Sequence, residues 1–437
     1  MSHLSFARRL FGLGVSSPPP EPALLPLPSP GRVLAIIGPS GAGKTCALKR
    51  LALQRGMRLC TPLTRQQLAR PVLSLFPARL PGATVLRALA RCGLSDATLW
   101  TRPARTLSAG EQRRLELALC TVPRAKDTPV CDVILDEFDA HLDGQTALAL
   151  AASLARLAAA QRMRLVVSTH RPECLGALHA ERVFRIEDGA ALELAPPAQL
   201  DLLAELSIER GSLSDYARFA RWHYLGSRRP GPVSDVFVAK LHGSAVAVAT
   251  FGHTHLFLSA RNLALPQFGS NVVSSGGAGA LNANVRLLQR VIVEPRYRAL
   301  GVASRLLSAA LPQLGVPIVE CLAEMGEFSG FLERAGFMRR GRCKPSREAA
   351  RLMANLRRLK LEAYQLCEPA RRKRALAGLP RREREKLLRQ LAGLCRSRIE
   401  TGAGRLRGTG QAPEKLLQRA LLRLHCQPEY FLWSQHA

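Results

Sequence analysis

One glycine-rich segment restricts the possible folds of this chain more than any other. Residues 38–45 follow the apolar run 33–37 and match the pattern G-x-x-x-x-G-K-[ST], as Gly38, Pro39, Ser40, Gly41, Ala42, Gly43, Lys44 and Thr45. The pattern predicts a buried strand, a turn and a helix. Its glycines let consecutive backbone N–H groups face one anion, and the helix start adds positive potential. We therefore expect phosphates at residues 38–45, with Lys44 reaching the outer phosphates and Thr45 binding Mg²⁺.

Two further apolar runs end in polar side chains that suit the same chemistry. Residues 130–136 read as a buried parallel strand that ends at Asp136 and Glu137, and residues 166–169 read as a strand that leads to His170. Ligands bind at the carboxyl ends of parallel strands. We therefore expect Asp136 to bind Mg²⁺ and Glu137 to polarise a water molecule. For a lone strand-end histidine, a structural role is the commoner alternative.

An octapeptide between these motifs completes a recognisable series. Residues 107–114 read Leu-Ser-Ala-Gly-Glu-Gln-Arg-Arg. Over about residues 31–195 the chain resembles the ATP-binding-cassette (ABC) ATPase family. The resemblance implies that Lys44 and Thr45 hold phosphate and magnesium and that Asp136 holds magnesium. It also implies that Glu137 is the catalytic base, that His170 contacts the γ-phosphate and that residues 139–143 form a D-loop. Ser108 and Gly110 would contact the ATP that the opposite protomer holds.

The resemblance implies a head-to-tail homodimer that encloses two ATP molecules.

The sequence differs from the usual motifs of the family at several positions. Ala109 and Glu111 replace the usual Gly and Gln of the Leu-Ser-Gly-Gly-Gln signature. Gln66 and Gln67 are both candidates for the glutamine that links the ATP site to a partner. Only 64 positions separate Lys44 from Ser108, which leaves room for a small helical subdomain and none for a long coiled coil.

The composition of the chain indicates where in the cell the protein is expected. The longest helical apolar stretch, 147–160, is too short and too polar to span a bilayer, so no transmembrane segment is expected. The first 30 residues are proline-rich and read as an extended linker. Eleven cysteines occur without a C-x-x-C pair, which favours reduced thiols and a cytoplasmic location.

The net charge of +30, from 63 Lys and Arg against 33 Asp and Glu, indicates a polyanionic partner such as a nucleic acid. The alternative is that high-GC coding bias inflates arginine on an ordinary solvated surface.

A second anion-binding pattern follows in the chain. Residues 287–295 read as a strand, 296–303 as a turn and 304–310 as a helix. The turn, with a strand at 317–325 and the segment 331–337, resembles the GNAT family of N-acyltransferases over about residues 212–342. The resemblance implies binding of acetyl-CoA or another acyl-CoA at Val293, Arg298, Ala299, Leu300, Gly301, Val302 and Ala303. The alternative is an unrelated α/β domain with a tight turn.

This second region lacks the usual general acid of the GNAT family, since Leu332 stands where many relatives place a tyrosine. The candidates for acid–base chemistry are Glu320, Glu324, Tyr297 and the cluster Trp222, His223 and Tyr224, which is followed by Arg228 and Arg229. Solvent-facing carboxylates and a core aromatic cluster are the commoner alternatives. Through His223, Tyr224 and its general layout, the region also resembles the GNAT-like Mom family of DNA-modification proteins.

From residue 343 onward arginines punctuate leucines at helical spacing, with breaks at Pro369 and Pro380. Basic amphipathic helices bind nucleic acid, anionic lipid or an acidic partner, or simply present a solvated charged face. The expected α/β chain has a Pro-rich linker (1–30), a P-loop ABC-type ATPase domain (31–200), a GNAT-like α+β acyltransferase domain (205–342) and a basic helical tail (343–437).

The whole arrangement resembles a small class of ABC-type ATPases fused to a predicted acetyltransferase domain. It implies ATP hydrolysis with Mg²⁺, coupled to acyl transfer onto a nucleic acid or a nucleic-acid-bound substrate. One alternative is a nucleic-acid-binding or repair ATPase whose GNAT-like domain is inactive. The other is the ATPase subunit of a transporter, which would need a membrane partner.

Overall fold

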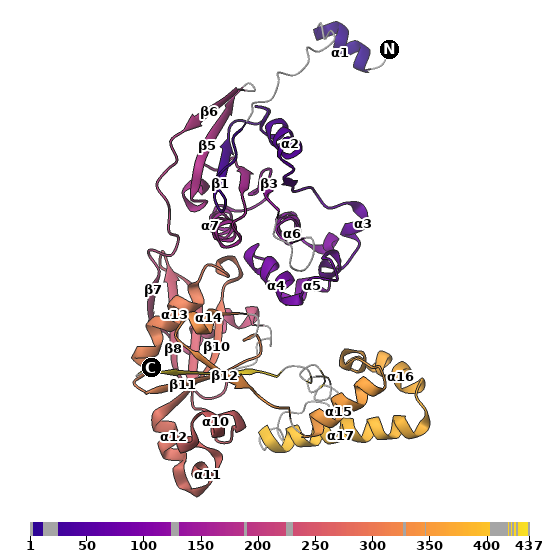
Figure 1. Ribbon diagram of the computed structural model, residues 1–437, viewed down its shortest axis with the longest axis vertical. Helices are drawn as coiled ribbons and strands as arrows, with labels where there is room; N and C mark the ends of the chain where they lie inside the picture. Colours follow the sequence, from indigo (N-terminus) through magenta and orange to yellow (C-terminus); the bar gives the residue numbers. More distant parts are fainter. Residues whose placement is uncertain are drawn as a thin grey trace. The chain divides into compact units, whose positions relative to one another are not determined.

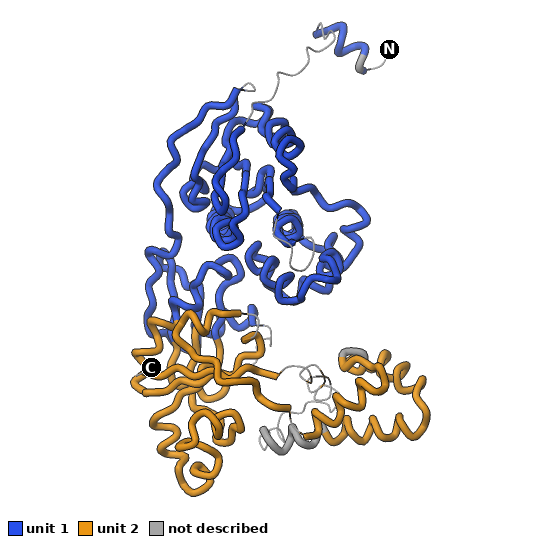
Figure 2. Tube along the Cα trace, in the orientation of Figure 1, with its two compact units in different colours: residues 1–229, 237–248, 291–306 blue, residues 230–236, 249–290, 307–437 orange. Residues whose placement is uncertain are grey.

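The computed structural model describes residues 3–11, 25–123, 131–187, 190–223, 230–326, 329–345, 347–402, 418, 421, 424 and 427–435 (Figure 1). The chain divides into two compact units (Figure 2). Unit 1 comprises residues 1–229, 237–248 and 291–306, and unit 2 comprises residues 230–236, 249–290 and 307–437.

A six-stranded sheet organises the first part of unit 1 (Figure 1). Neighbouring strands pair in parallel except for the last, which is antiparallel to its neighbour. The spatial order is β2 (Arg58–Leu59), β3 (Val133–Leu135), β4 (Leu165–Ser168), β1 (Val33–Ile37), β5 (Ala180–Glu187) and β6 (Ala190–Leu194). The carboxyl ends of β1, β3 and β4 therefore meet at one edge, where ligands bind in such sheets.

Helices cover both faces of this sheet. Leu34 and Ile36 of β1 pack into a core with α2 (Lys44–Arg55), whereas Val33 and Ala35 pack into a core with α4 (Gly82–Arg91), α6 (Ala109–Cys120) and α7 (Gly144–Gln161). A strand buried on both faces must be apolar at every position. This requirement explains the continuous Val-Leu-Ala-Ile-Ile run.

The start of the chain differs from the expected extended linker. Residues His3–Phe11 form helix α1, and residues 12–24 lie outside the described part. The prediction of a linker from residue 1 is wrong for this stretch, because it contains no proline or glycine and local propensity favours a helix. The strand expected at 130–136 is confirmed only for β3, and Val130 is outside the described residues.

Seven strands form a second sheet, and two of its neighbouring strands are parallel. Strands β10 and β11 pair in parallel and are joined through helix α13 (Val302–Ala310). The order is β12 (Met338–Arg342), β13 (Glu429–Ser434), β11 (Ile318–Ala323), β10 (Val285–Val293), β9 (Ser244–Gly252), β8 (Val233–Leu241) and β7 (Ser207–Arg210).

The last strand corrects the expectation of a helical tail through residue 437. Strand β13 lies between β11 and β12 and is antiparallel to both. Its sequence, Glu-Tyr-Phe-Leu-Trp-Ser, is rich in aromatic residues, which favour strands, and Tyr430, Phe431 and Leu432 are buried. Residues 343–428 are thus an excursion between two neighbouring strands, and they contain helices α15 (Arg347–Arg358), α16 (Pro369–Ala377) and α17 (Arg381–Gly402).

Short helices complete both parts. They are α3 (Arg65–Leu68), α5 (Ala97–Trp100), α8 (Cys174–Ala177), α9 (Leu213–Phe219), α10 (Ser259–Ala264), α11 (Ser270–Val272), α12 (Ala278–Asn284) and α14 (Phe331–Arg334). Among the described residues, no helix has the length and apolar character that crossing a membrane requires.

Candidate functional site

The glycine-rich loop connects the end of β1 to the start of α2, as expected. Gly38, Gly41 and Gly43 have φ angles of 145°, 82° and 97°, in the region that favours glycine. A Cβ on Gly38 would lie 2.3 Å from the backbone oxygen of Ile186, so a side chain there would collide with β5. Gly43 precedes α2 without any side-chain cap. The first N–H groups of α2 therefore remain able to bind an anion.

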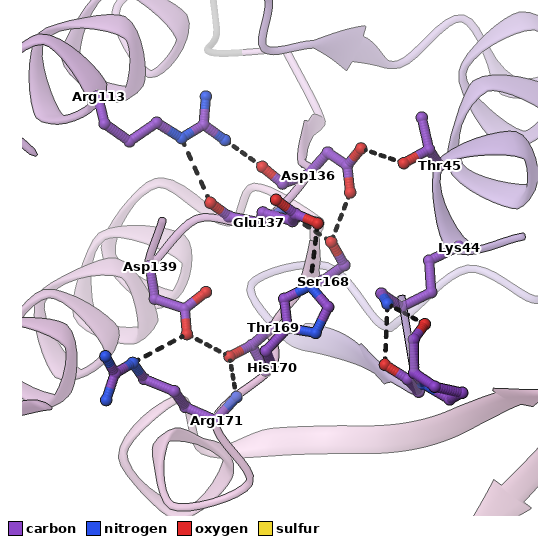
Figure 3. Close-up of polar contacts among 12 residues, drawn as sticks. Lys44, Thr45, Arg113, Asp136, Glu137, Asp139, Ser168, Thr169, His170 and Arg171 are labelled. Atoms are coloured by element: carbon purple, nitrogen blue, oxygen red, sulfur yellow. Dashed lines mark hydrogen bonds and ion pairs between the residues drawn. The ribbon is translucent and has the colours of Figure 1, made fainter. Parts of the chain in front are cut away.

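Lys44 lies within the curve of this loop. Its side chain is buried, and its Nζ donates to the backbone oxygens of Gly38 at 2.8 Å and Pro39 at 2.7 Å (Figure 3). These neutral acceptors fix the ammonium beside the N–H groups of the loop. A phosphate oxygen would be a stronger, charged acceptor at the same place.

Thr45, Asp136 and Ser168 form a hydrogen-bonded row across the ends of three elements (Figure 3). The Oγ1 of Thr45 donates to Asp136 Oδ2 at 2.7 Å, and the Oγ of Ser168 donates to Asp136 Oδ1 at 2.6 Å. A hydroxyl beside a carboxylate fits Mg²⁺, which takes few protein ligands and shares the rest with phosphates and water. Among the described residues, no group of three or more His, Cys, Asp or Glu could hold a metal ion by itself.

Glu137 and His170 face each other at the same edge. The His170 Nε2 lies 2.9 Å from Glu137 Oε1, and the two side chains are 43% and 48% exposed, so water reaches both. Glu137 has a φ of 46°, rare for a residue with a side chain, and its N–H donates to Ser168 Oγ at 2.7 Å. Such backbone conformations cluster at functional sites. Two residues predicted from separate motifs are thus brought together.

The sequence analysis missed residues that hold the acidic strand end in place. Arg113 on α6 donates to the backbone oxygens of Asp136 and Glu137, the latter at 3.4 Å, and its Nη1 pairs with Glu116 at 3.0 Å. In the sequence, only the position of Arg113 within the octapeptide 107–114 pointed to this residue.

A second missed group fixes the start of the 139–143 loop. The Oγ1 of Thr169 donates to Asp139 Oδ2 at 2.6 Å, and Arg171 lies 3.7 Å from the same oxygen (Figure 3). Nothing in the sequence pairs these residues.

Ser108 caps helix α6 and forms a capping box with Glu111. Its Oγ accepts from the Glu111 N–H at 3.3 Å, and the Glu111 carboxylate accepts from the Ser108 N–H at 2.8 Å. This geometry gives Glu111 a structural role that a glutamine could also fill, and the Ser-x-x-Glu spacing was the available signal. A Cβ on Gly110 would lie 2.9 Å from the backbone oxygen of His141, so glycine allows α6 to approach the 139–143 loop.

The two candidate glutamines differ in their surroundings. The Gln67 Oε1 accepts from the Thr64 N–H at 2.9 Å in a second capping box, whereas Gln66 is exposed. The side chain of Gln67 is therefore committed to helix α3.

Residues 293–303, expected to bind acyl-CoA, run from the end of β10 into α13. Ala299 and Gly301 have φ angles of 65° and 92°, in the left-handed region. Arg298 points elsewhere, because its guanidinium donates to the backbone oxygens of Val293, Ser95 and Trp222 at 2.9, 2.8 and 3.0 Å. Burial lowers the pKa of Arg298.

A residue of α7 also contacts this turn. Arg156 donates to the backbone oxygen of Leu300, and a Cβ on Gly301 would lie 3.4 Å from Arg156 Nη1. The other members of the expected set, Val302 and Ala303, form the first positions of α13.

The acid–base candidates of this region are mostly occupied. Glu320 is fully buried against Arg261 and Tyr430, at 2.6 and 2.8 Å. Tyr297 is buried, which raises its pKa. Trp222 packs edge-on against Phe219, with 5.3 Å between ring centroids. Glu324 is half-buried and His223 ends the turn after α9, whereas Tyr224, Arg228 and Arg229 lie outside the described residues.

No model of a known protein family matches the chain, whereas curated relatives match part of it. The phosphonates import ATP-binding protein PhnC of Anaeromyxobacter dehalogenans is 37% identical over 158 residues, 36% of this chain and only 30% of PhnC. The cytochrome c biogenesis ATP-binding export protein CcmA of Rhodospirillum rubrum is 35% identical over 172 residues, 33% of this chain and 70% of CcmA.

Two solved structures are also similar. An ATP-binding cassette of an ABC transporter in its ADP conformation has 15% identity and a TM-score of 0.29, and covers 38% of this chain and 80% of its own. The complex of archaeal ribosome recycling factor aABCE1 has 20% identity and a TM-score of 0.32, and covers 40% of each chain.

The aliphatic sulfonates import ATP-binding protein SsuB of Mycobacterium avium matches over a longer stretch. It is 34% identical over 199 residues, which span 40% of this chain and 74% of SsuB. This agrees with the order of the glycine-rich loop, the octapeptide and the acidic strand end. The chain therefore belongs to the ATP-binding-cassette ATPase family.

Proposed function

We propose that the chain binds ATP with Mg²⁺ and hydrolyses it as a head-to-tail homodimer. The row of Thr45, Asp136 and Ser168 beside the Glu137–His170 pair is the observation that carries this proposal. A magnesium ligand pair, a carboxylate base and an anion-binding loop lie at one sheet edge, as phosphoryl transfer to water requires.

Each side chain has a distinct role in this mechanism. Lys44 and the N–H groups of the loop bind the phosphates. Bound Mg²⁺ neutralises phosphate charge and orients the phosphates. Glu137 accepts a proton from the attacking water, and His170, 2.9 Å away, orients that carboxylate and contacts the γ-phosphate.

The homodimer supplies the opposite face of each site. Ser108 is exposed at the N-terminus of α6, where N–H groups and a hydroxyl attract phosphate. Because one cassette is present in the chain, a second copy is the simplest source of the partner helix.

ATP hydrolysis tests the assignment of the base. Glu137→Gln keeps the shape of the side chain and removes its proton affinity, so hydrolysis should fall by roughly 10²–10⁴-fold while ATP binding persists. Glu193→Gln is the matched control, because Glu193 is an exposed glutamate at the sheet edge, paired only with Arg182. Equal hydrolysis by the Glu137→Gln variant and the wild type would refute the assignment.

The second region is proposed to transfer an acyl group from acyl-CoA to an amine of a nucleic acid or a nucleic-acid-bound substrate. Support comes from the turn at residues 294–301, which precedes α13 and contains two left-handed residues. The parallel β10–β11 pair places that turn at a strand carboxyl end, and the net charge of +30 suits a polyanionic substrate.

Calorimetric titration with acetyl-CoA tests this part. Gly301→Val introduces a β-branched side chain at a φ of 92°, so it should abolish binding if the turn holds the pyrophosphate. Gly315→Val is the control, because Gly315 also has a positive φ, of 65°, but lies beyond α13. Unchanged binding in the Gly301→Val variant would exclude the turn as the CoA site.

Two other functions have specific support. The three carbonyl contacts of Arg298 and the buried state of Glu320 favour an inactive acyltransferase-like region attached to a nucleic-acid-dependent ATPase. That candidate predicts no acetyl-CoA binding.

The names of the relatives, two of which are import ATP-binding proteins, favour a transporter subunit. That candidate predicts that affinity purification from cells recovers a polytopic membrane protein.

A further inference from the structure

The excursion at residues 343–428 leaves and rejoins the second sheet at one place. Arg342 and Glu429 are register partners in strands β12 and β13, and the Arg342 Nε lies 2.9 Å from Glu429 Oε1. One position further on, the Cys343 N–H donates to the Pro428 oxygen at 2.9 Å. The excursion is therefore an inserted module on a closed neck, which we call the helical insert.

The helical insert has a hydrophobic core of its own. Its buried members are Ala349, Leu352, Met353, Leu356, Ala363, Leu366, Cys367, Leu387, Leu391, Leu421 and Leu424. The amide of Asn355 on α15 also donates to Gln390 on α17 at 2.8 Å. The apolar faces of α15 and α17 are thus turned toward each other, which leaves their charged faces outward.

The helical insert carries half of the net charge of the chain. Residues 343–428 contain 22 Lys and Arg against 7 Asp and Glu, a net charge of +15 out of +30 in a fifth of the length. Three of its described cations, Arg358, Arg371 and Arg381, are held in ion pairs. Within the described part, the following exposed cations have side chains that form no hydrogen bond or ion pair: Arg347, Arg351, Arg357, Lys360, Lys373, Arg374, Arg382, Lys386 and Arg389.

We propose that the helical insert binds the phosphate backbone of a double-stranded nucleic acid. Like charges at this density repel one another, and a row of phosphates relieves the repulsion while counterions are released. This inference extends the nucleic-acid part of the proposed function and places that contact on a defined module.

Two features favour a duplex over other polyanions. An amphipathic helix that binds a bilayer inserts exposed apolar side chains, whereas the described helices of the insert bury theirs and expose only Leu388 among large hydrophobic residues. Proteins that bind single strands stack bases on aromatic side chains, and Tyr364 is the only aromatic residue in positions 343–428. A protein that binds a regular array of backbone phosphates needs neither exposed apolar side chains nor aromatic side chains.

Fluorescence anisotropy of a labelled short duplex, as DNA and as RNA, measures this binding across a salt series without ATP or acyl-CoA. In one variant an Asn-Gly turn joins Arg342 directly to Glu429 and removes the insert, and it should lose duplex binding. In a second, Lys373→Glu with Arg374→Glu should weaken binding by roughly tenfold or more and reduce the slope of log K against log salt by about two. Arg8→Glu with Arg9→Glu is the matched control, an adjacent exposed pair on α1 that should leave binding unchanged.

The outcomes separate this inference from the proposed enzyme activities. Duplex binding that is lost in the deletion variant, weakened by roughly tenfold or more in the double charge reversal and kept in the control supports the inference, even if the protein shows no ATP hydrolysis or acyl transfer. Wild-type affinity in the double charge reversal overturns it, whether or not the deletion variant folds. Binding to vesicles of anionic phospholipid without duplex binding, or equal affinity and salt slope for single strands, also overturns it.

Discussion

The replacement of Glu320 by glutamine should destabilise the second sheet rather than remove a catalytic base. Arg261 and Glu320 have side chains that are 1% and 0% exposed, and they form two hydrogen bonds of 3.0 and 2.6 Å. Tyr430 on β13 donates a third hydrogen bond to the carboxylate, at 2.8 Å. Glutamine keeps the volume but leaves the guanidinium of Arg261 buried without a counter-charge.

The expected loss of stability in the Glu320→Gln variant follows from the burial of this ion pair. Removal of one partner of a buried ion pair costs about 3–5 kcal/mol, a large part of the total stability of a domain, about 5–15 kcal/mol. The double variant Arg261→Met with Glu320→Leu removes both charges and should cost far less than the sum of the single variants. Glu333→Gln is the control, because the Glu333 side chain is 37% exposed and its ion pair with Arg339 should contribute at most about 1 kcal/mol.

Urea unfolding followed by tryptophan fluorescence measures these effects locally. The tryptophans are Trp100, Trp222 and Trp433, so replacement of the first two by phenylalanine leaves a probe on β13. The unfolding midpoint of the Glu320→Gln variant should lie at a lower urea concentration than that of the wild type. The midpoint of the double variant should lie close to the wild-type value. If the Glu320→Gln transition coincides with that of the wild type, the pair does not stabilise the sheet, and a loss of acyl transfer at unchanged stability would restore Glu320 as a catalytic candidate.

Three further predictions concern the ATPase part. Ser108→Asp places a negative charge about 4 Å from the expected phosphate position, worth about 4 kcal/mol near a protein surface, so hydrolysis should fall by roughly 10³-fold. The melting temperature should also fall, because the Ser108 Oγ lies 3.0 Å from a Glu111 carboxylate oxygen, which the new carboxylate would repel. Gly110→Ala forces a Cβ to within 2.9 Å of the His141 oxygen and should lower the melting temperature, with a cost of about 1–3 kcal/mol. At pH 8, iodoacetamide should label the exposed Cys46 and spare Cys92 until denaturant is added, because burial raises the pKa of Cys92 to about 12; mass spectrometry of the peptides distinguishes the two.

The sequence predicted which side chains meet at this sheet edge because its signals are local. The loop that ends at Lys44 encodes its own conformation in three glycines, and Asp136, Glu137 and His170 each follow a short apolar run. Parallel strands align their carboxyl ends, so three separate runs predicted one site.

The sequence did not predict contacts that depend on long-range packing. Arg113 reaches the strand end of Asp136 from a helix whose angle is set by the core. Two of the three acceptors of Arg298, Ser95 and Trp222, come from distant parts of the chain, so a motif that suggests phosphate binding could not reveal that its arginine is occupied. The prediction of a helical tail is wrong for residues 429–434, because the helical spacing of the preceding residues does not continue into this aromatic run.

The position of β13 has a consequence for the order in which the chain folds. Strands β11 and β12 are synthesised before the helical insert, and β13 comes after it, yet β13 pairs with both of them. Until residue 434 has left the ribosome, two strands expose unpaired backbone groups, which recruit other chains. The insert can bury its own core during this interval. A ribosome that stalls within residues 343–428 would therefore release a chain with open strand edges, prone to aggregate beside a folded ATPase core.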